Sequence, residues 1–137
     1  MWASRRQAQQ ERRQQEEVAG WDARALEDLG AATMLSFGGF GFAAIKSPAT
    51  LAYEYLREAG PRVRSGLQDL LATASPAGRV YAAHLLERLD PAHGRRVWGW
   101  LADQPDAFAT GSGCLMGQST LRDYAREQLV RTPVEPS

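Results

Sequence analysis

The sequence has one cysteine, Cys114, in a glycine-rich segment that precedes a predicted helix. A thiolate there could act as a nucleophile if a histidine folded against it, and His84 is the better candidate because it lies on a predicted packed helix. This chemistry also needs an orienting group and an oxyanion hole, which the sequence alone does not place. A lone cysteine in such a loop is more commonly a small buried apolar residue. A thiol-dependent enzyme or redox-responsive protein is therefore an alternative hypothesis.

The same segment, residues 109–118, could bind an anion or a small ligand through its backbone. Glycines before a helix N-terminus can direct several N–H groups at one ligand. The segment is not a P-loop, because Ser112 stands where the first glycine belongs and Gln118 replaces the lysine. We predict a structural glycine-rich loop, in which Gly113 and Cys114 are candidate binding residues.

Four aromatic residues are candidate anchors for a protein partner. Trp98 and Trp100 lie about 200° apart on a helical wheel, so we expect one of them near the surface. Tyr53 and Tyr81 lie off the main apolar stripes of their predicted helices. Exposed aromatic side chains often anchor protein interfaces, and packing between helix layers explains the same pattern.

Prolines divide the middle of the chain into short helices. The pairs Ser47-Pro48, Gly60-Pro61, Ser75-Pro76 and Asp90-Pro91 each place proline at the first position of a helix, where its missing N–H costs nothing. Apolar residues follow with helical periodicity. The predicted helices span about residues 22–29, 48–59, 61–73, 76–89, 91–103 and 119–131.

Short connections between these helices predict an all-α fold of antiparallel helix pairs. Each helix has an apolar stripe to bury, including Trp21 in the first and Leu51 in the second. The Gly/Phe-rich segment near 34–46 does not fit a helix, and we expect a loop or short β-like excursion packed across the helix ends. A hydrophobic ligand or partner groove is the alternative for this segment.

The two central helix pairs resemble each other. Ser47-Pro48-Ala49 followed by Tyr53 matches Ser75-Pro76-Ala77 followed by Tyr81. This pattern, over residues 47–104, resembles HEAT-like α-helical repeats, although its period is shorter than their roughly 40 residues. The resemblance implies stacked pairs that present a curved binding surface. The chain also looks like small bacterial helical proteins, which implies no activity.

Composition limits the function classes. The chain has 137 residues, about the size of one domain, and 16 basic residues balance 16 acidic ones. This balance argues against a nucleic-acid adaptor built on Arg5, Arg6, Arg12, Arg13 and the Arg95-Arg96 pair, which stays an alternative. One cysteine excludes an internal disulfide and a cysteine-rich zinc site.

We expect a single helical domain over residues 21–131, with a polar helix or tail over 1–20 and a tail over 132–137. The N-terminus lacks the apolar core of a secretory signal, and no apolar run is long enough to cross a bilayer, so we expect a cytoplasmic protein. The leading hypothesis is a non-enzymatic helical scaffold or adaptor that binds another protein, with no cofactor, metal or membrane.

Overall fold

The computed structural model describes residues 2–39 and 45–131. This part contains six α-helices, one 3-10 turn and three strands. The helices are α1 (Trp2–Gly30), α2 (Pro48–Ala59), α3 (Arg64–Thr73), α4 (Pro76–Leu89), α5 (Pro91–Leu101) and α6 (Leu121–Arg131), and the strands are β1 (Met34–Leu35), β2 (Ala107–Ser112) and β3 (Leu115–Thr120). The predicted mostly helical character is confirmed.

Three helices begin where the sequence predicts, because a side chain caps each one. Ser47 and Ser75 accept hydrogen bonds from the backbone N–H groups three residues later, each at 3.1 Å. Asp90 does the same at 3.3 Å. Proline occupies the first turn each time, so α2, α4 and α5 start by one local rule.

The predicted helix over 61–73 is partly wrong. Gly60, with a φ of 73°, ends α2, and residues Gly60–Val63 form a 3-10 turn before α3 begins at Arg64. This turn redirects the chain, so α2 packs mainly on α1 and α4, while α3 packs on α4. The HEAT-like stacking of two helix pairs stays a prediction.

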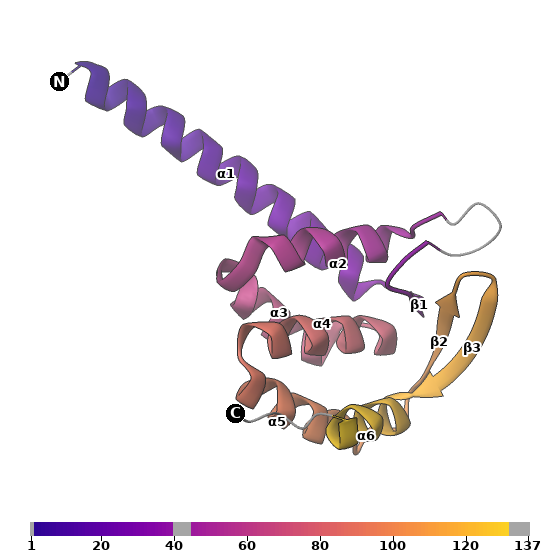
Figure 1. Cartoon of the computed structure of the whole chain (residues 1–137). Helices are drawn as coiled ribbons and strands as arrows, with labels where there is room; N and C mark the ends of the chain where they lie inside the picture. Colours follow the sequence, from indigo (N-terminus) through magenta and orange to yellow (C-terminus); the bar gives the residue numbers. More distant parts are fainter. Residues whose placement is uncertain (1, 40–44, 132–137) are drawn as a thin grey trace.

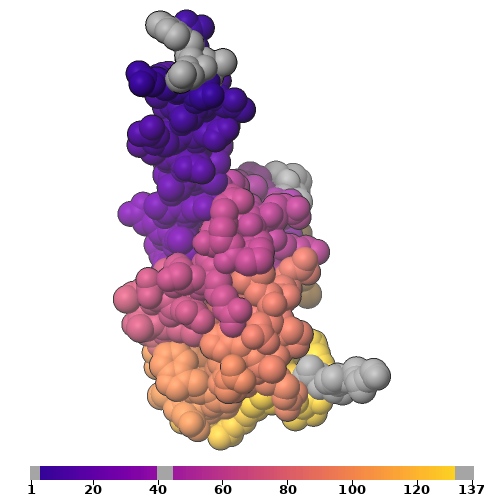
Figure 2. Space-filling view, turned by 90° about the vertical axis from the view of Figure 1, so that its left-hand side faces the viewer, coloured from indigo at the N-terminus to yellow at the C-terminus, as the bar shows by residue number. Residues whose placement is uncertain are grey.

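Helix α1 is much longer than the predicted packed segment over 22–29. It runs unbroken from Trp2 to Gly30, and its first half projects away from the other helices (Figures 1 and 2). Side chains 4–17 are all exposed, and Val18 is the first that neighbours partly cover. We call residues 4–20 the arm, and the rest of the described chain the body.

A small sheet, which the all-α prediction lacks, lies beside α4 and α6. Its order is β1-β2-β3, with β1 parallel to β2 and β2 antiparallel to β3. The predicted loop over 109–118 is therefore a hairpin, with Gly113 and Cys114 between the paired residues Ser112 and Leu115. Gly113 has a φ of 59°, as tight hairpin turns require.

The Gly/Phe-rich segment contributes β1 at its start, which agrees with the predicted short β-like excursion. Its residues 40–44 lie outside the described part of the chain. All six helices contribute side chains to the core. Its largest side chains with under 2% exposure are Trp98, Tyr81, Leu29, Leu56, Leu67, Leu86, Leu101 and Leu121.

Candidate functional site

Two of the predicted binding residues, Tyr81 and Trp98, belong to the core, and a third, Tyr53, packs against it. Tyr81 is 0% exposed and Trp98 is 1% exposed, so neither can anchor a partner at the surface. Tyr53 is partly buried, and its ring packs on Tyr81 with centroids 5.5 Å apart. The packing interpretation of these aromatics is therefore correct for all three. Tyr53 of α2 and Tyr81 of α4 are therefore neighbours across the contact between these two helices.

The hydroxyl of Tyr81 holds the start of the Gly/Phe-rich segment in place. It donates a hydrogen bond to the carbonyl of Ser36 at 2.6 Å and accepts one from the N–H of Ser36 at 2.8 Å. Thr50 donates a second bond to the same carbonyl at 2.8 Å. All these groups are buried, and each backbone group of Ser36 has a partner.

Next to this contact, His84 pairs with Tyr124, a contact that the sequence does not predict. The Nε2 of His84 shares a hydrogen bond of 2.7 Å with the Tyr124 hydroxyl. The His84 ring also meets Phe37, Trp98 and Tyr124 edge to face, with centroids 4.9–5.7 Å apart. The two residues lie 40 positions apart, so no local spacing could reveal the pair.

Burial sets the ionisation of this pair. Desolvation lowers the pKa of His84 to about 4, helped by the charge of Arg131, and raises the pKa of Tyr124 to about 12. Both groups are therefore neutral at pH 7. A histidine with so low a pKa is a weak base, and the pair acts as a buried polar link between α4 and α6.

Trp100, Gly113 and Cys114 are exposed. Trp100 is 48% exposed on α5, as expected if only one tryptophan of that helix packs. Gly113 and Cys114 occupy the hairpin turn, where the exposed position of Cys114 contradicts the expected burial. The reason is that the strands project this turn away from the helices (Figure 1).

A hollow of about 330 Å³ lies between the hairpin and the residues that follow β1. Its walls include Phe37, Gly38, Thr110, Gly113 and Tyr124. Among the described residues that line it, none is lysine, arginine, histidine or acidic. This part of the molecule therefore offers hydroxyls, backbone groups and two aromatic rings, but no charge that would bind an ion.

A shallow, mainly apolar groove of about 380 Å³ lies between α1 and α2. Trp21 is 58% exposed and Leu51 is 53% exposed, and both line it together with Pro48 and Tyr55. The sequence predicts that Trp21 and Leu51 are buried. They are exposed instead, because Ala25 and Leu29 form the side of α1 that packs on the core, and other residues of α2 form the corresponding side of that helix.

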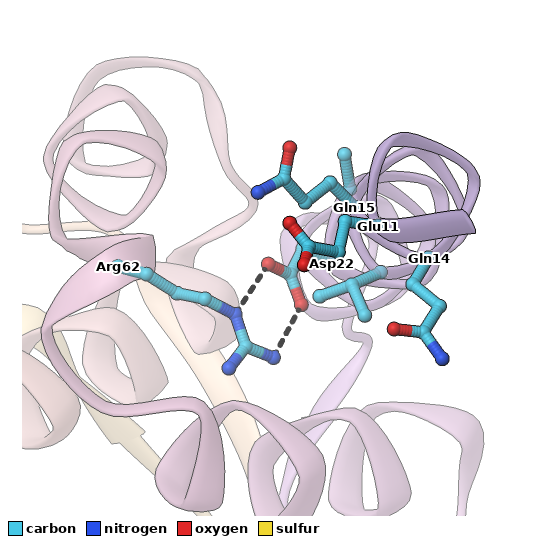
Figure 3. Close-up of a pocket in the computed structure, with 7 residues that line it drawn as sticks. Glu11, Gln14, Gln15, Asp22 and Arg62 are labelled. Carbon is cyan, nitrogen blue, oxygen red and sulfur yellow. Dashed lines mark hydrogen bonds and ion pairs between the residues drawn. The ribbon is translucent and has the colours of Figure 1, made fainter. Parts of the chain in front are cut away.

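The base of the arm is fixed to the body by one carboxylate (Figure 3). Arg62 donates two hydrogen bonds to Asp22, from Nε at 2.9 Å and from Nη2 at 3.1 Å, and the Tyr55 hydroxyl donates a third at 2.7 Å. The bonds from Arg62, and then that from Tyr55, lower the pKa of Asp22. This anchor fixes the direction in which α1 leaves the body.

The described residues contain no cluster of three or more His, Cys, Asp or Glu side chains that could hold a metal ion. In the same part of the chain, no helix is long and apolar enough to cross a membrane.

Comparisons with known proteins give no family assignment. No protein-family model matches the chain, and neither the curated proteins nor the solved structures gave a significant match. Any function must therefore be argued from the residues themselves.

Proposed function

We propose that the chain is a protein-interaction module that binds a helical segment of another protein in the groove between α1 and α2. The observation that carries the proposal is the joint exposure of Trp21 and Leu51 along one apolar groove. Large apolar side chains are costly to leave in water, and neighbouring exposed ones commonly mark interaction sites. Trp is also among the residue types enriched at the centres of protein interfaces.

The walls of this groove are preorganised for binding. Beneath Trp21, the α1 residues Ala25 and Leu29 are buried, and Leu56 of α2 is 1% exposed. The Asp22 anchor holds the same stretch of α1 against the body. A rigid surface loses little conformational entropy on binding, so more of the contact energy becomes affinity.

The shape and rim of the groove support an amphipathic helix as its ligand. It lies between two helices, and its volume of about 380 Å³ is enough for large apolar side chains. Arg24 and Asp28 stand on its rim with opposite charges. We therefore expect a partner helix with an apolar stripe and flanking charges of both signs.

Support for the thiol-enzyme alternative is weaker. That hypothesis needs His84 as a base, and burial lowers the pKa of His84 to about 4. Its Nε2 also already shares a hydrogen bond with Tyr124. A non-enzymatic module fits these features better.

Affinity capture with matched variants tests the proposal. Trp21→Ala with Leu51→Ala should remove a specific partner that the wild-type chain retains from a lysate of its source organism. Trp100→Ala is the control, because it also removes an exposed tryptophan but lies on α5. The isolated partner should then bind the purified chain, and a peptide with the sequence of the partner's helical segment should displace it. Equal recovery by all three proteins would refute the proposed groove.

A further inference from the structure

The charges along α1 are arranged against the stability of an isolated helix. Residues 4–13 carry four arginines and one glutamate, whereas residues 14–30 carry five carboxylates and one arginine. A helix is stabilised by acidic groups near its N-terminus and basic groups near its C-terminus. α1 has no acidic residue in its first turn and no basic residue in its last turn. Its charge order therefore requires another explanation.

Packing within the body explains this order only in part, through the ion pair of Asp22 with Arg62. At 100° per residue, Arg5, Arg12, Glu16, Gly20 and Glu27 share one face of α1, opposite the face that packs on the body. All five are exposed. We call this the outer face. Arg12 and Arg13 form no ion pair with any residue that the structure describes.

The outer face also contains a glycine that nothing in the body requires. Gly20 lies inside a helix, where glycine weakens the structure relative to alanine. A Cβ added there would meet no atom within 4 Å. Gly20 and Ala23 instead line a shallow hollow of about 590 Å³ that also includes Glu27. Small residues of this kind allow another backbone to approach closely.

We infer that the outer faces of α1 from two copies of this chain pair antiparallel. In this arrangement, the basic half of each helix faces the acidic half of the other, which supplies the charge complementarity that one chain lacks. A register centred near Gln14 places Arg12 of each copy beside Glu16 of the other, with Arg13 and Glu17 flanking this contact. The two helix dipoles also oppose each other. The pairing does not use the Trp21 groove, so it goes beyond the proposed function.

A nucleic acid fits the outer face less well. Its phosphates would be attracted to the arginines of residues 4–13 but repelled by the carboxylates immediately after them. A second copy matches both halves at once. The length of exposed helix supports the same occupant, because an unpacked helical arm is only marginally stable in water.

Charge reversal in the full-length chain tests the inference. Sedimentation velocity should show a wild-type dimer that forms with rising protein concentration and weakens as the salt increases from about 0.01 M to about 1 M. The variant Arg12→Glu/Arg13→Glu and the variant Glu16→Arg/Glu17→Arg should each lose at least about tenfold in self-affinity, because like charges then oppose each other. An equimolar mixture of the two variants should restore the dimer.

Two controls make the result specific. Arg88→Glu/Arg126→Glu changes the net charge by the same amount as Arg12→Glu/Arg13→Glu, at exposed positions outside α1, and should leave the dimer unchanged. Circular dichroism should show that each variant keeps its helix content. A wild-type monomer at every concentration in low salt would overturn the inference, as would a dimer insensitive to both reversals. Binding of duplex DNA by a monomeric wild type, lost in Arg12→Glu/Arg13→Glu, would also overturn it. Loss of partner capture by the Trp21 variant alone would concern only the groove.

Discussion

Polar side chains have opposite surroundings in the body and in the arm. In the body, His84, Tyr81 and Tyr124 are enclosed by aromatic rings and hydrogen bonded to fixed partners. In the arm, the arginine and glutamate side chains are exposed to solvent and do not pack on the core. In the body these polar groups therefore contribute to packing, whereas in the arm the charged groups lie at the surface.

Few described contacts connect the arm to the body. Asp22 marks the point at which α1 enters the body, where it is bound by Arg62 (Figure 3) and also by Tyr55. Beyond it, toward the N-terminus, only Val18 is partly covered. Substitutions in the core of the body should therefore change the stability of the fold, and substitutions in the arm should change self-association.

The largest expected effect is the loss of Trp98. Its side chain is 1% exposed and packs on His84 and Tyr124, so Trp98→Ala should lower the free energy of unfolding by about 3–5 kcal/mol. Urea unfolding followed by circular dichroism measures the change. Trp100→Ala, at a 48% exposed site, should change it by less than about 0.5 kcal/mol. Equal losses in both variants would contradict the assignment of Trp98 to the core.

Acid should weaken the body through His84. Its pKa falls from 6.5 to about 4 on folding, so the unfolded chain binds more protons between these values. Stability contributed by neutral His84 is present above pH 6.5 and is lost as the pH falls toward 4, by about 2 kcal/mol at pH 5. Urea midpoints at pH 7 and pH 5 test this. His84→Phe should remove that part of the pH dependence, and an unchanged slope would show that His84 is not the group responsible.

Tyr81→Phe should lower the free energy of unfolding by about 1–2 kcal/mol, because it leaves the buried N–H of Ser36 without a partner. The carbonyl of Ser36 keeps its bond from Thr50. Tyr53→Phe is the matched control, since the Tyr53 hydroxyl forms no hydrogen bond with a described residue. Thermal unfolding should separate the two variants; identical curves would mean that the Tyr81 bonds contribute nothing.

The smallest effect is expected at Gly20. Gly20→Ala should strengthen α1 by about 0.5–1 kcal/mol, because alanine favours a helix interior and the site has room for a Cβ. If the outer face pairs closely at this point, the same change should weaken the dimer. Ellipticity at low protein concentration and sedimentation at high concentration measure the two effects separately. A variant that gains helix and also dimerises more tightly would contradict close approach at Gly20.

Local signals in the sequence predict much of the helical fold. Pro48, Pro76 and Pro91 follow side chains that cap a helix, and this combination predicts α2, α4 and α5 with correct starts. The start of α3 differs because the positive φ of Gly60 leads into a 3-10 turn. The start of α1 lies well before the predicted packed helix over 22–29. A polar helix without an apolar stripe resembles a disordered tail in sequence, so residues 1–20 could be predicted only as one or the other.

Contacts between distant segments could not be predicted in this way. The β2–β3 hairpin resembles a loop because glycines interrupt it, although the alternation of Phe108, Thr110 and Ser112 and the Gly113-Cys114 turn are the signals that could have revealed it. The His84–Tyr124 pair depends on how α4 and α6 pack. The Trp21 groove depends on smaller residues filling the inner faces of α1 and α2.

Hydrogen–deuterium exchange of the intact chain tests the contrast between arm and body most directly. At low protein concentration, amides of α4 and α5 should exchange slowly, and amides of residues 4–17 should exchange quickly because no core protects them. At high concentration and low salt, residues 4–17 should become protected while the body stays unchanged. Arm amides as protected as those of α4 at low concentration, or unaffected by concentration, would contradict the account.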